Sequence, residues 1–431
     1  MVGGNGRRVA IIAGCRTAFV KSGTVFKDLG AVELARLATR ELLVRTEVPP
    51  AEVDQVIFGQ VIPSVLAPNV AREVSLLPQF PGTIPAHSMN RACASSNQAV
   101  AAAHDQIVLG QADVVVAGGT ESLSDIPILH SRRFAEILVQ ASRAKSLGQR
   151  LGALAATRPR DLVPVTPAIA EPSTGETMGQ AAEKMAKENG ITREAQDAFA
   201  LRSHQLAAAG TADGRLTAEI APVFVPPTYG TVVTADNGIR ADSTLEQLAA
   251  LRPVFDRRYG SVTAGNASPL TDGASAVLLM SDEAARALGY EPLAYVRAYA
   301  VAAVDPGEQL LMGPAFAVPK ALEHAGLAWS DLGLVEMHEA FAAQVLSNIQ
   351  AFESDMWARE RLGRTQRLGE VNRDTLNVMG GSIAIGHPFG ATGGRITTTL
   401  ANEMRRRDVQ FGLISVCAQG GMGFAMVLER T

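Results

Sequence analysis

One cysteine stands where a polar turn leads into an alanine-rich stretch with helical character. Cys93 lies in the segment 89–97, MNRACASSN. A helix N-terminus stabilises an anion, so a thiol at that place is expected to have a lowered pKa. The small neighbours on both sides would leave the sulfur accessible to a substrate. A buried structural cysteine is the alternative interpretation, and a base close to Cys93 would decide in favour of a nucleophile.

A histidine in a glycine-rich segment is the candidate base. His387 lies within 380–394, GGSIAIGHPFGATGG. Glycine at this density around one histidine and one proline indicates a tight backbone path rather than a packed core. A histidine held in that way is suited to accept the proton of a thiol. A turn histidine without a chemical role is the alternative.

Two further reactive groups follow apolar strand-like segments. Cys417 precedes 418–423, AQGGMG, whose backbone N–H groups could approach a ligand oxygen as in an oxyanion hole. His338 precedes Glu339, but Ala342 stands where a zinc-protease motif needs its second histidine, so we expect no metal site. A nucleophile, a base, an oxyanion donor and a second acid or base are the set required for reversible acyl transfer with carbon–carbon bond cleavage.

Composition narrows the class of protein. The 431 residues are 47% apolar and 19% charged, which excludes a disordered chain and suits a large globular one. The net charge of −4 is unlike that of a nucleic-acid-binding protein. Three widely spaced cysteines, the third being Cys15, are no disulfide framework and indicate a reducing compartment. The apolar stretch 9–12 is too short for a secretion signal, so we expect a cytoplasmic protein.

The elements that must position these residues follow an α/β pattern, with a sheet covered on both faces. A weak internal repeat relates 51–59 to 329–337, and each copy is followed by a turn, a helix, a strand and a glycine pair. Two similar halves with an insertion at about 122–255 are the economical interpretation. We expect strands at 9–12, 56–59, 112–119 and 411–416, and helices at 29–45, 94–110, 178–190 and 192–210, with another opening at 386–388.

The insertion contains a basic amphipathic segment. Residues 130–160 carry seven arginines and lysines against one acidic residue, Glu136, with apolar residues at helical spacing. One interpretation is a solvated helix face folded on the body of the protein. The other is a docking site for an anionic ligand, a partner subunit or an anionic membrane surface.

Six segments, taken in order, resemble the thiolase family, and the resemblance covers essentially the whole chain. It is closest to the thiolase (β) subunit of the fatty-acid-oxidation trifunctional complex, because His338 stands where most thiolases carry asparagine and because 131–160 and 352–373 are similar to segments of that group. The six segments are 90–96, 118–122, 265–268, 338–341, 386–388 and 417–423.

The resemblance implies a thiolase fold, with two similar α/β halves in a five-layered αβαβα arrangement and an inserted loop domain. Residues 1–121 plus 256–285 would form the N-terminal half and 286–431 the C-terminal half. Residues 122–255 would form the loop domain that covers coenzyme A.

The resemblance also implies residue roles. Cys93 would take the acyl group, His387 would activate it, and Cys417 would exchange a proton with the α-carbon of acetyl-CoA. His338 would polarise a thioester oxygen, directly or through water. The backbone N–H groups of Cys93 and Gln419 would form the other oxyanion hole, although Gln419 replaces a usual glycine. Coenzyme A would be a co-substrate, with no bound cofactor, and its expected contacts are Arg240, Ser268, Met178 and Phe255.

The implied activity is that of a 3-ketoacyl-CoA thiolase of fatty acid β-oxidation, which yields acetyl-CoA and a shortened acyl-CoA. A biosynthetic acetoacetyl-CoA thiolase would use the same residues, and a non-catalytic acyl-CoA-binding scaffold subunit is the remote alternative. Cys417 with its glycine turn disfavours a ketoacyl synthase. A homodimer or larger assembly, and a hydratase/dehydrogenase α subunit as partner, are implied as well.

Overall fold

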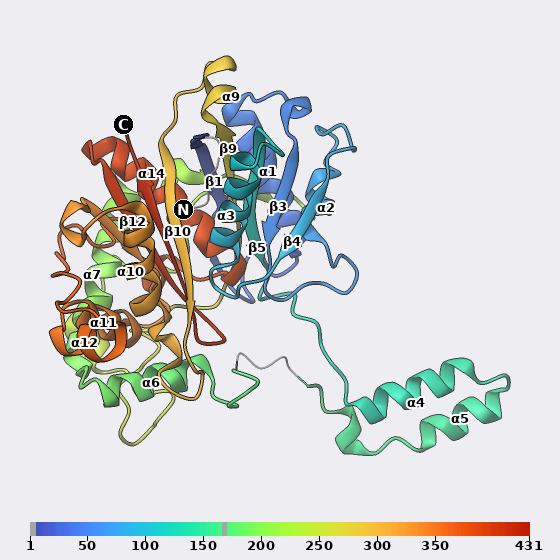
Figure 1. Ribbon diagram of the computed structural model, residues 1–431. Helices are drawn as coiled ribbons and strands as arrows, with labels where there is room; N and C mark the ends of the chain where they lie inside the picture. The colour runs from blue at the N-terminus through green and yellow to red at the C-terminus, as the bar shows by residue number, and fades with distance from the viewer. Residues whose placement is uncertain (1–5, 166–169) are drawn as a thin grey trace.

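The strands of both halves join one mixed sheet. The computed structural model describes residues 6–165 and 170–431. The strand order is β11-β12-β13-β10-β1-β9-β5-β3-β4 (Figure 1). The two halves meet where β1 pairs antiparallel with β10, at Ala10 with Tyr295 and at Ile11 with Ala294. The strands are β1 Val9–Thr17, β3 Gln55–Gly59, β4 Ala86–Met89, β5 Val114–Glu121, β9 Thr271–Ser281, β10 Ala294–Ala303, β11 Leu334–Met337, β12 Phe411–Ala418 and β13 Met422–Glu429.

Short strands complete the β-structure. β2 (Val20–Lys21) pairs with β9, and β6 (Ile220–Ala221) pairs with β1. β7 (Val223–Val225) and β8 (Thr231–Val233) form a separate antiparallel pair.

Helices cover the outer face of the strands in each half, and two more helices lie between the halves. Outer helices, strands, inner helices, strands and outer helices make up the five layers. The inner pair, α3 (Ser95–Val108) and α14 (Thr392–Arg407), pack on each other and on strands of both halves. An added Cβ at Gly393 would lie 2.1 Å from Asn97 Oδ1, so α14 needs glycine there to approach α3. α1 (Ala31–Thr46) and α2 (Val70–Ser75) cover the outer face of the first half, and α10 (Gly313–Ala325) and α11 (Ala342–Phe352) that of the second. The remaining helices of the two halves are α9 (Asp282–Ala287), α12 (Asp355–Leu362) and α13 (Ser382–Ile385).

The internal repeat appears as a repeated supersecondary unit. A single 3-10 turn at Pro50–Glu52 leads into β3, and a matching turn at Trp329–Asp331 leads into β11. β3 is parallel to β5, and β11 is parallel to β12. The strands therefore end at comparable places in the two halves, where reactive groups follow them.

Several predicted helix ends differ from the structure by one or two residues, and two of the differing boundaries concern glycines. α7 (Arg193–Ala212) starts after the expected cap, Thr192, but it continues past Gly210. Gly210 is buried inside this helix. An added Cβ would lie 2.3 Å from Met379 Cε, so glycine is needed here for close packing rather than to end the helix. The helix expected to open at 386–388 begins only at Thr392, because Gly386 adopts a φ of 117° and a short loop carries His387.

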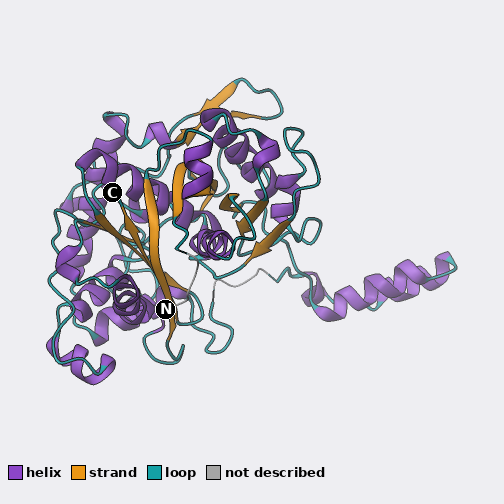
Figure 2. Cartoon of the chain, turned by 45° about the horizontal axis from the view of Figure 1, so that its top comes forward, coloured by secondary structure: helices purple, strands orange, loops and turns teal. Residues whose placement is uncertain are grey.

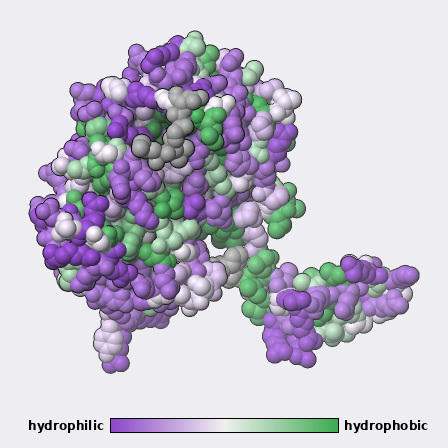
Figure 3. Space-filling view, viewed as in Figure 1, coloured by the Kyte–Doolittle hydropathy of each residue, from purple (hydrophilic) through white to green (hydrophobic). Residues whose placement is uncertain are grey.

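The basic segment forms a helical hairpin that projects from the body of the molecule (Figures 1 and 2). α4 (Arg132–Arg143) packs against α5 (Leu147–Ala155) and the turn Pro159–Leu162. The interpretation of a face folded on the body is wrong, because Ile137 and Ala141 are buried within the hairpin itself. Figure 3 shows apolar surface on the hairpin and on the flanking residues that connect it to the body. The exposed apolar residues are Ile128, Leu129, Leu138, Val139, Leu147, Leu151, Leu154, Leu162, Val163 and Val165.

The rest of the region between the halves packs on them. α6 (Met178–Glu188) contacts α11, and α7 contacts α11 and α13, while α8 (Leu245–Ala249) packs on α7. Among the described residues, no helix combines the length and apolar character that a membrane span requires.

Candidate active site

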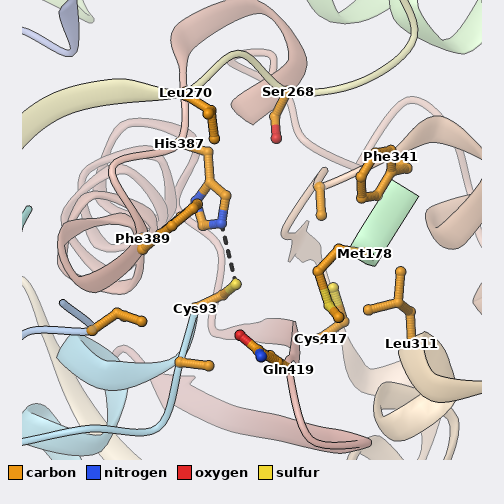
Figure 4. Close-up of a pocket in the computed structure, with 13 residues that line it drawn as sticks. Cys93, Met178, Ser268, Leu270, Leu311, Phe341, His387, Phe389, Cys417 and Gln419 are labelled. Carbon is orange, nitrogen blue, oxygen red and sulfur yellow. Dashed lines mark hydrogen bonds between the residues drawn. The ribbon is translucent and has the colours of Figure 1, made fainter. Parts of the chain in front are cut away.

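Three of the four predicted reactive residues, Cys93, His387 and Cys417, line one open pocket of about 600 Å³, a volume that includes solvent at its mouth (Figure 4). Both halves and the inserted region contribute to its wall. The lining is largely apolar, which suits a ligand with a hydrocarbon part. The lining residues are Val61, Ala92, Cys93, Met178, Ser268, Leu270, Leu311, Ala340, Phe341, His387, Phe389, Cys417 and Gln419.

A strained turn presents Cys93 to the pocket. Ala92 has a φ of 45°, a left-handed conformation that is costly for alanine. The turn is held because Asn90 Oδ1 accepts from the Ala92 N–H at 2.9 Å and the Ser95 hydroxyl donates to the Ala92 carbonyl at 2.6 Å. α3 begins directly afterwards, at Ser95, so Cys93 precedes the helix as expected.

His387 reaches Cys93 across the interface between the two halves. Its Nε2 lies 3.2 Å from Cys93 Sγ, and its Nδ1 lies 2.7 Å from Thr392 Oγ1 on the first turn of α14. The His387 backbone N–H donates to the Pro269 carbonyl at 3.2 Å, which fixes the loop against the first half. The nucleophile-base geometry that the sequence could only suggest is therefore present.

The ionisation state of this pair differs from the sequence prediction. Burial raises the pKa of the Cys93 thiol to about 12, although the backbone N–H groups of Gln419 and Cys93 act in the opposite direction. Burial, helped by the charge of Arg395, lowers the pKa of His387 to about 3. The expected lowered thiol pKa is wrong, because burial outweighs the backbone N–H groups that favour the thiolate. The resting pair is a neutral thiol beside a neutral imidazole.

Cys417 faces the same pocket from the end of β12. It is 1% exposed, and burial raises the pKa of its thiol well above the ordinary value, with the charge of Cys93 acting in the same direction. Gly420 and Gly421, with φ values of 87° and 71°, make the turn back into β13. The Gln419 side chain donates to the Ala170 carbonyl at 2.8 Å and thereby links this turn to the inserted region.

His338 lies behind the pocket wall and is fully buried. Its ring centroid is 4.2 Å from that of His387, and its Nδ1 is 3.1 Å from Ser382 Oγ. Burial and the charges of His387 and Arg395 lower the pKa of His338 well below its ordinary value. Cys93, His338 and His387 each offer a donor atom within 4.8 Å of the others, a set that a soft metal ion could occupy only by blocking the nucleophile.

The four predicted coenzyme A contacts are not all in the pocket. Met178 and Ser268 line it, whereas Phe255 stands one layer behind, edge-on to Phe341 at a centroid distance of 6.2 Å. Arg240 is exposed and lies outside the pocket lining. Its charge adds to burial in lowering the pKa of Lys21, so the two cations are neighbours.

Sequence reasoning missed several residues that support the site. Thr392 and Ser382 lie within the glycine-rich segment around His387, and their hydroxyl groups were the available signal. Glu121 accepts hydrogen bonds from the backbone N–H groups of Val61, Ile62 and Gly390, and burial raises its pKa to about 7. This carboxyl group holds two segments of the pocket wall together.

Comparison with known proteins identifies the family. The model of the thiolase N-terminal domain matches residues 9–283, and that of the thiolase C-terminal domain matches residues 290–430. The chain belongs to the thiolase family. It is 51% identical over 424 residues to a 3-ketoacyl-CoA thiolase of Aeromonas salmonicida, covering 98% of this chain and 97% of that protein.

Solved structures agree with this assignment to the thiolases. The chain is similar to an acetyl-CoA acetyltransferase of Bacillus anthracis, with a TM-score of 0.84 and 36% identity over 98% of each chain. It is also similar to human mitochondrial 3-ketoacyl-CoA thiolase in complex with CoA, with a TM-score of 0.82 and 33% identity over 99% of this chain and 98% of that one. The thiolase fold expected from the sequence is confirmed.

Proposed function

We propose that this thiolase is a 3-ketoacyl-CoA thiolase of fatty acid β-oxidation that works through a Cys93 acyl-enzyme. The observation that carries the proposal is the 3.2 Å approach of His387 Nε2 to Cys93 Sγ in a pocket that Cys417 also lines. The 51% identity to the 3-ketoacyl-CoA thiolase of Aeromonas salmonicida supports the substrate class.

The first half-reaction is cleavage. Cys93 Sγ attacks the 3-keto carbon while its proton passes to His387 Nε2, whose Nδ1–H is held by Thr392 Oγ1. Backbone N–H groups of Cys93 and Gln419 stabilise the negative oxygen that forms; removing one such donor typically costs ~10²–10³ in kcat. When the oxygen returns to a carbonyl, the bond between the keto carbon and the α-carbon breaks. Cys417 then protonates the α-carbon, which leaves as acetyl-CoA.

The second half-reaction releases the shortened chain. The thiol of free coenzyme A attacks the Cys93 thioester, and its proton passes to the Cys417 thiolate left by the first half-reaction, which restores the Cys417 thiol. Cys93 departs as a thiolate and recovers the proton from His387. His338 polarises a thioester oxygen during these steps. No bound cofactor is needed, because coenzyme A is a co-substrate.

Coenzyme A binding uses the pocket mouth and the inserted region. Met178 and Ser268 contact the arm of the ligand, with Phe255 behind them. The neighbouring cations Lys21 and Arg240 would attract phosphate groups beyond the mouth. Residues 122–255 then act as the covering loop domain, between halves formed by 1–121 with 256–285 and by 286–431.

The projecting hairpin is proposed to dock a partner. Its basic residues and exposed leucines suit a hydratase/dehydrogenase α subunit, and an anionic membrane is the alternative for the same surface. The enzyme itself is proposed to act as a homodimer or larger assembly, as the family resemblance implies.

A thiolysis assay tests the proposal. Free coenzyme A would be supplied with 3-ketoacyl-CoA of four, eight or sixteen carbons, with Cys93→Ala as the control. Activity that rises with chain length supports the degradative assignment. Activity confined to four carbons would favour the acetoacetyl-CoA enzyme, which the likeness to the acetyl-CoA acetyltransferase keeps as second candidate. Absence of Cys93-dependent activity at every length would overturn the function.

A further inference from the structure

A buried chain of hydrogen bonds leads from an arginine to His338. Arg395 Nη2 donates to Ser382 Oγ at 3.1 Å, and the same oxygen lies 3.1 Å from His338 Nδ1. All three side chains are at most 1% exposed. Arg395 comes from α14, Ser382 from α13, and His338 from the end of β11, so the chain joins three elements.

The protons of this chain can be assigned from the donor inventory. A guanidinium group only donates, so Ser382 Oγ must accept from Arg395. The serine has a single hydroxyl proton, and His338 Nδ1 is the acceptor within reach among the described residues. The reverse arrangement, Nδ1–H donating to Ser382, would leave a buried hydroxyl proton unsatisfied, at a cost of about 1–3 kcal/mol. Nδ1 is therefore the acceptor, and Nε2 carries the hydrogen.

The imidazole stays neutral in this position. Burial and the charges of His387 and Arg395 lower the pKa of His338, so a second proton does not bind near neutral pH. Arg395 in turn lies 3.7 Å from Oε2 of Glu336, a buried acid whose pKa burial raises to about 8. A neutral imidazole donates through one nitrogen only, and its tautomer decides which.

The free nitrogen of His338 belongs to the active site. Nε2 is buried and has no hydrogen-bond partner among the described residues. A nitrogen of His338 lies within 4.8 Å of the donor atoms of Cys93 and His387. An unsatisfied buried N–H beside the nucleophile is suited to meet the oxygen of a bound thioester.

We propose that Arg395 and Ser382 are positioning residues that hold His338 as the Nε2–H tautomer, which makes it an oxyanion donor to the thioester. The inference rests on the proposed function, because it assigns a specific donor to the same reaction. Ser382 thereby has a role other than packing. Because its oxygen accepts a hydrogen bond from Arg395, its hydroxyl hydrogen is directed to His338 Nδ1, and the ring hydrogen stays on Nε2.

Nitrogen-15 NMR of the full-length enzyme labelled at histidine tests the tautomer directly. Protonated and unprotonated ring nitrogens have well separated shifts, and His338→Asn identifies the signals of His338. We expect a protonated Nε2 and an unprotonated Nδ1 in the wild type. A protonated Nδ1 would overturn the proposal, whatever the enzyme's activity. Absence of thiolysis would instead overturn the function and leave the tautomer result standing.

A double-mutant cycle separates positioning from structural support. We expect Ser382→Ala to lower kcat for thiolysis by ~10²-fold, as for loss of one oxyanion donor, with a smaller effect on KM. In a His338→Asn background the same change should cost little, because the proton it directs is gone. Ser382→Thr, which retains the hydroxyl, should restore most of kcat. Equal losses from Ser382→Ala in both backgrounds would overturn the proposal.

Discussion

At Cys93 and His387 both ionised forms are disfavoured before a substrate binds. The pKa of the thiol is raised to about 12 by burial, and that of the imidazole is lowered to about 3. The thiol is therefore protonated and the imidazole neutral across the range in between. Charge separation has to accompany attack, when the substrate oxygen takes over the negative charge and the backbone donors of Cys93 and Gln419 receive it.

A titration of the free enzyme tests this description. Because a raised thiol pKa keeps the proton on until high pH, we expect no step in thiolate absorbance between about pH 6 and pH 9. The pKa of Cys15 is also raised to about 12 by burial, so it contributes none. Ultraviolet difference spectra of wild type against Cys93→Ser would isolate the signal. A step near neutral pH would mean a stabilised thiolate-imidazolium pair instead.

The two thiols of the pocket are expected to act in different steps of the reaction, so a substitution at Cys417 should impair one step more than the other. Cys417→Ser replaces the proposed α-carbon acid with a hydroxyl of much higher pKa, so we expect deuterium exchange at the acetyl-CoA methyl group to fall by ~10²–10⁴-fold. Acyl transfer to Cys93, followed by intact mass, should fall much less. Cys15→Ser is the matched control, because this buried cysteine donates a hydrogen bond to the Ala38 carbonyl and does not line the active-site pocket. Equal damage to both steps would contradict the division of roles.

Single residues could be predicted where the local sequence carried the signal. Glycine-rich surroundings marked His387 and Cys417, and a turn before a helix marked Cys93. The direction of the Cys93 pKa shift could not be predicted, because the pocket around Cys93 is lined by residues from 61 to 419. Ser382 gains its task from Arg395 and His338, a relation that spacing along the chain does not encode.

At the scale of elements, the periodic pattern predicted strands and helices better than their ends. Gly210 shows why. The sequence suggested that this glycine ends a helix, but it lies within α7 and makes room for the side chain of Met379, which packs against that helix. The hairpin of α4 and α5 was predictable as basic and amphipathic. Its projection from the body depends on packing between its own helices, which leaves Leu147 and Leu151 exposed.

The hairpin should be separable from catalysis. Because its helices pack on each other and on their own turn, we expect that replacing residues 130–163 with a short Gly/Ser linker leaves thiolysis of the four-carbon substrate unchanged. Sedimentation with phosphatidylserine vesicles, or with a purified α subunit, should then be lost if the hairpin docks either partner.

Charge reversal at Arg132 and Arg143 provides a milder control that keeps the hairpin. It should weaken an electrostatic contact most at low salt. Binding that survives both changes would place the docking surface elsewhere on the molecule.

At the scale of the whole molecule, β1 ties the parts together. It pairs with β9 of its own half and with β10 of the other, and Arg16 on β1 reaches Asp236 and Glu219 of the inserted region. The sequence predicted two halves and an insertion. It could not predict that the buried Arg16 pairs with Asp236, more than two hundred positions away, because such a pairing leaves no local pattern in the sequence.

Removing Arg16 should therefore destabilise the molecule strongly. Its guanidinium is fully buried and donates to both Asp236 oxygens, at 2.7 and 2.8 Å, and Asp236 also accepts from the Phe19 N–H. Arg16→Ala leaves a buried carboxylate without its partner, at an expected cost of about 3–5 kcal/mol in unfolding free energy.

Urea unfolding followed by fluorescence and circular dichroism measures this cost. The matched control is Arg132→Ala, whose ion pair with Glu136 is on an exposed helix face, with a side chain 95% exposed, and should change stability by ~0.5 kcal/mol or less. Arg16→Met combined with Asp236→Leu should recover part of the loss, because the Asp236 carboxylate is then no longer buried without its partner, while Glu219 keeps its hydrogen bonds from Thr399 and Asn402. If Arg16→Ala behaved like the Arg132 control, the ion pair would not hold the inserted region to β1, and that attachment would rest on apolar packing.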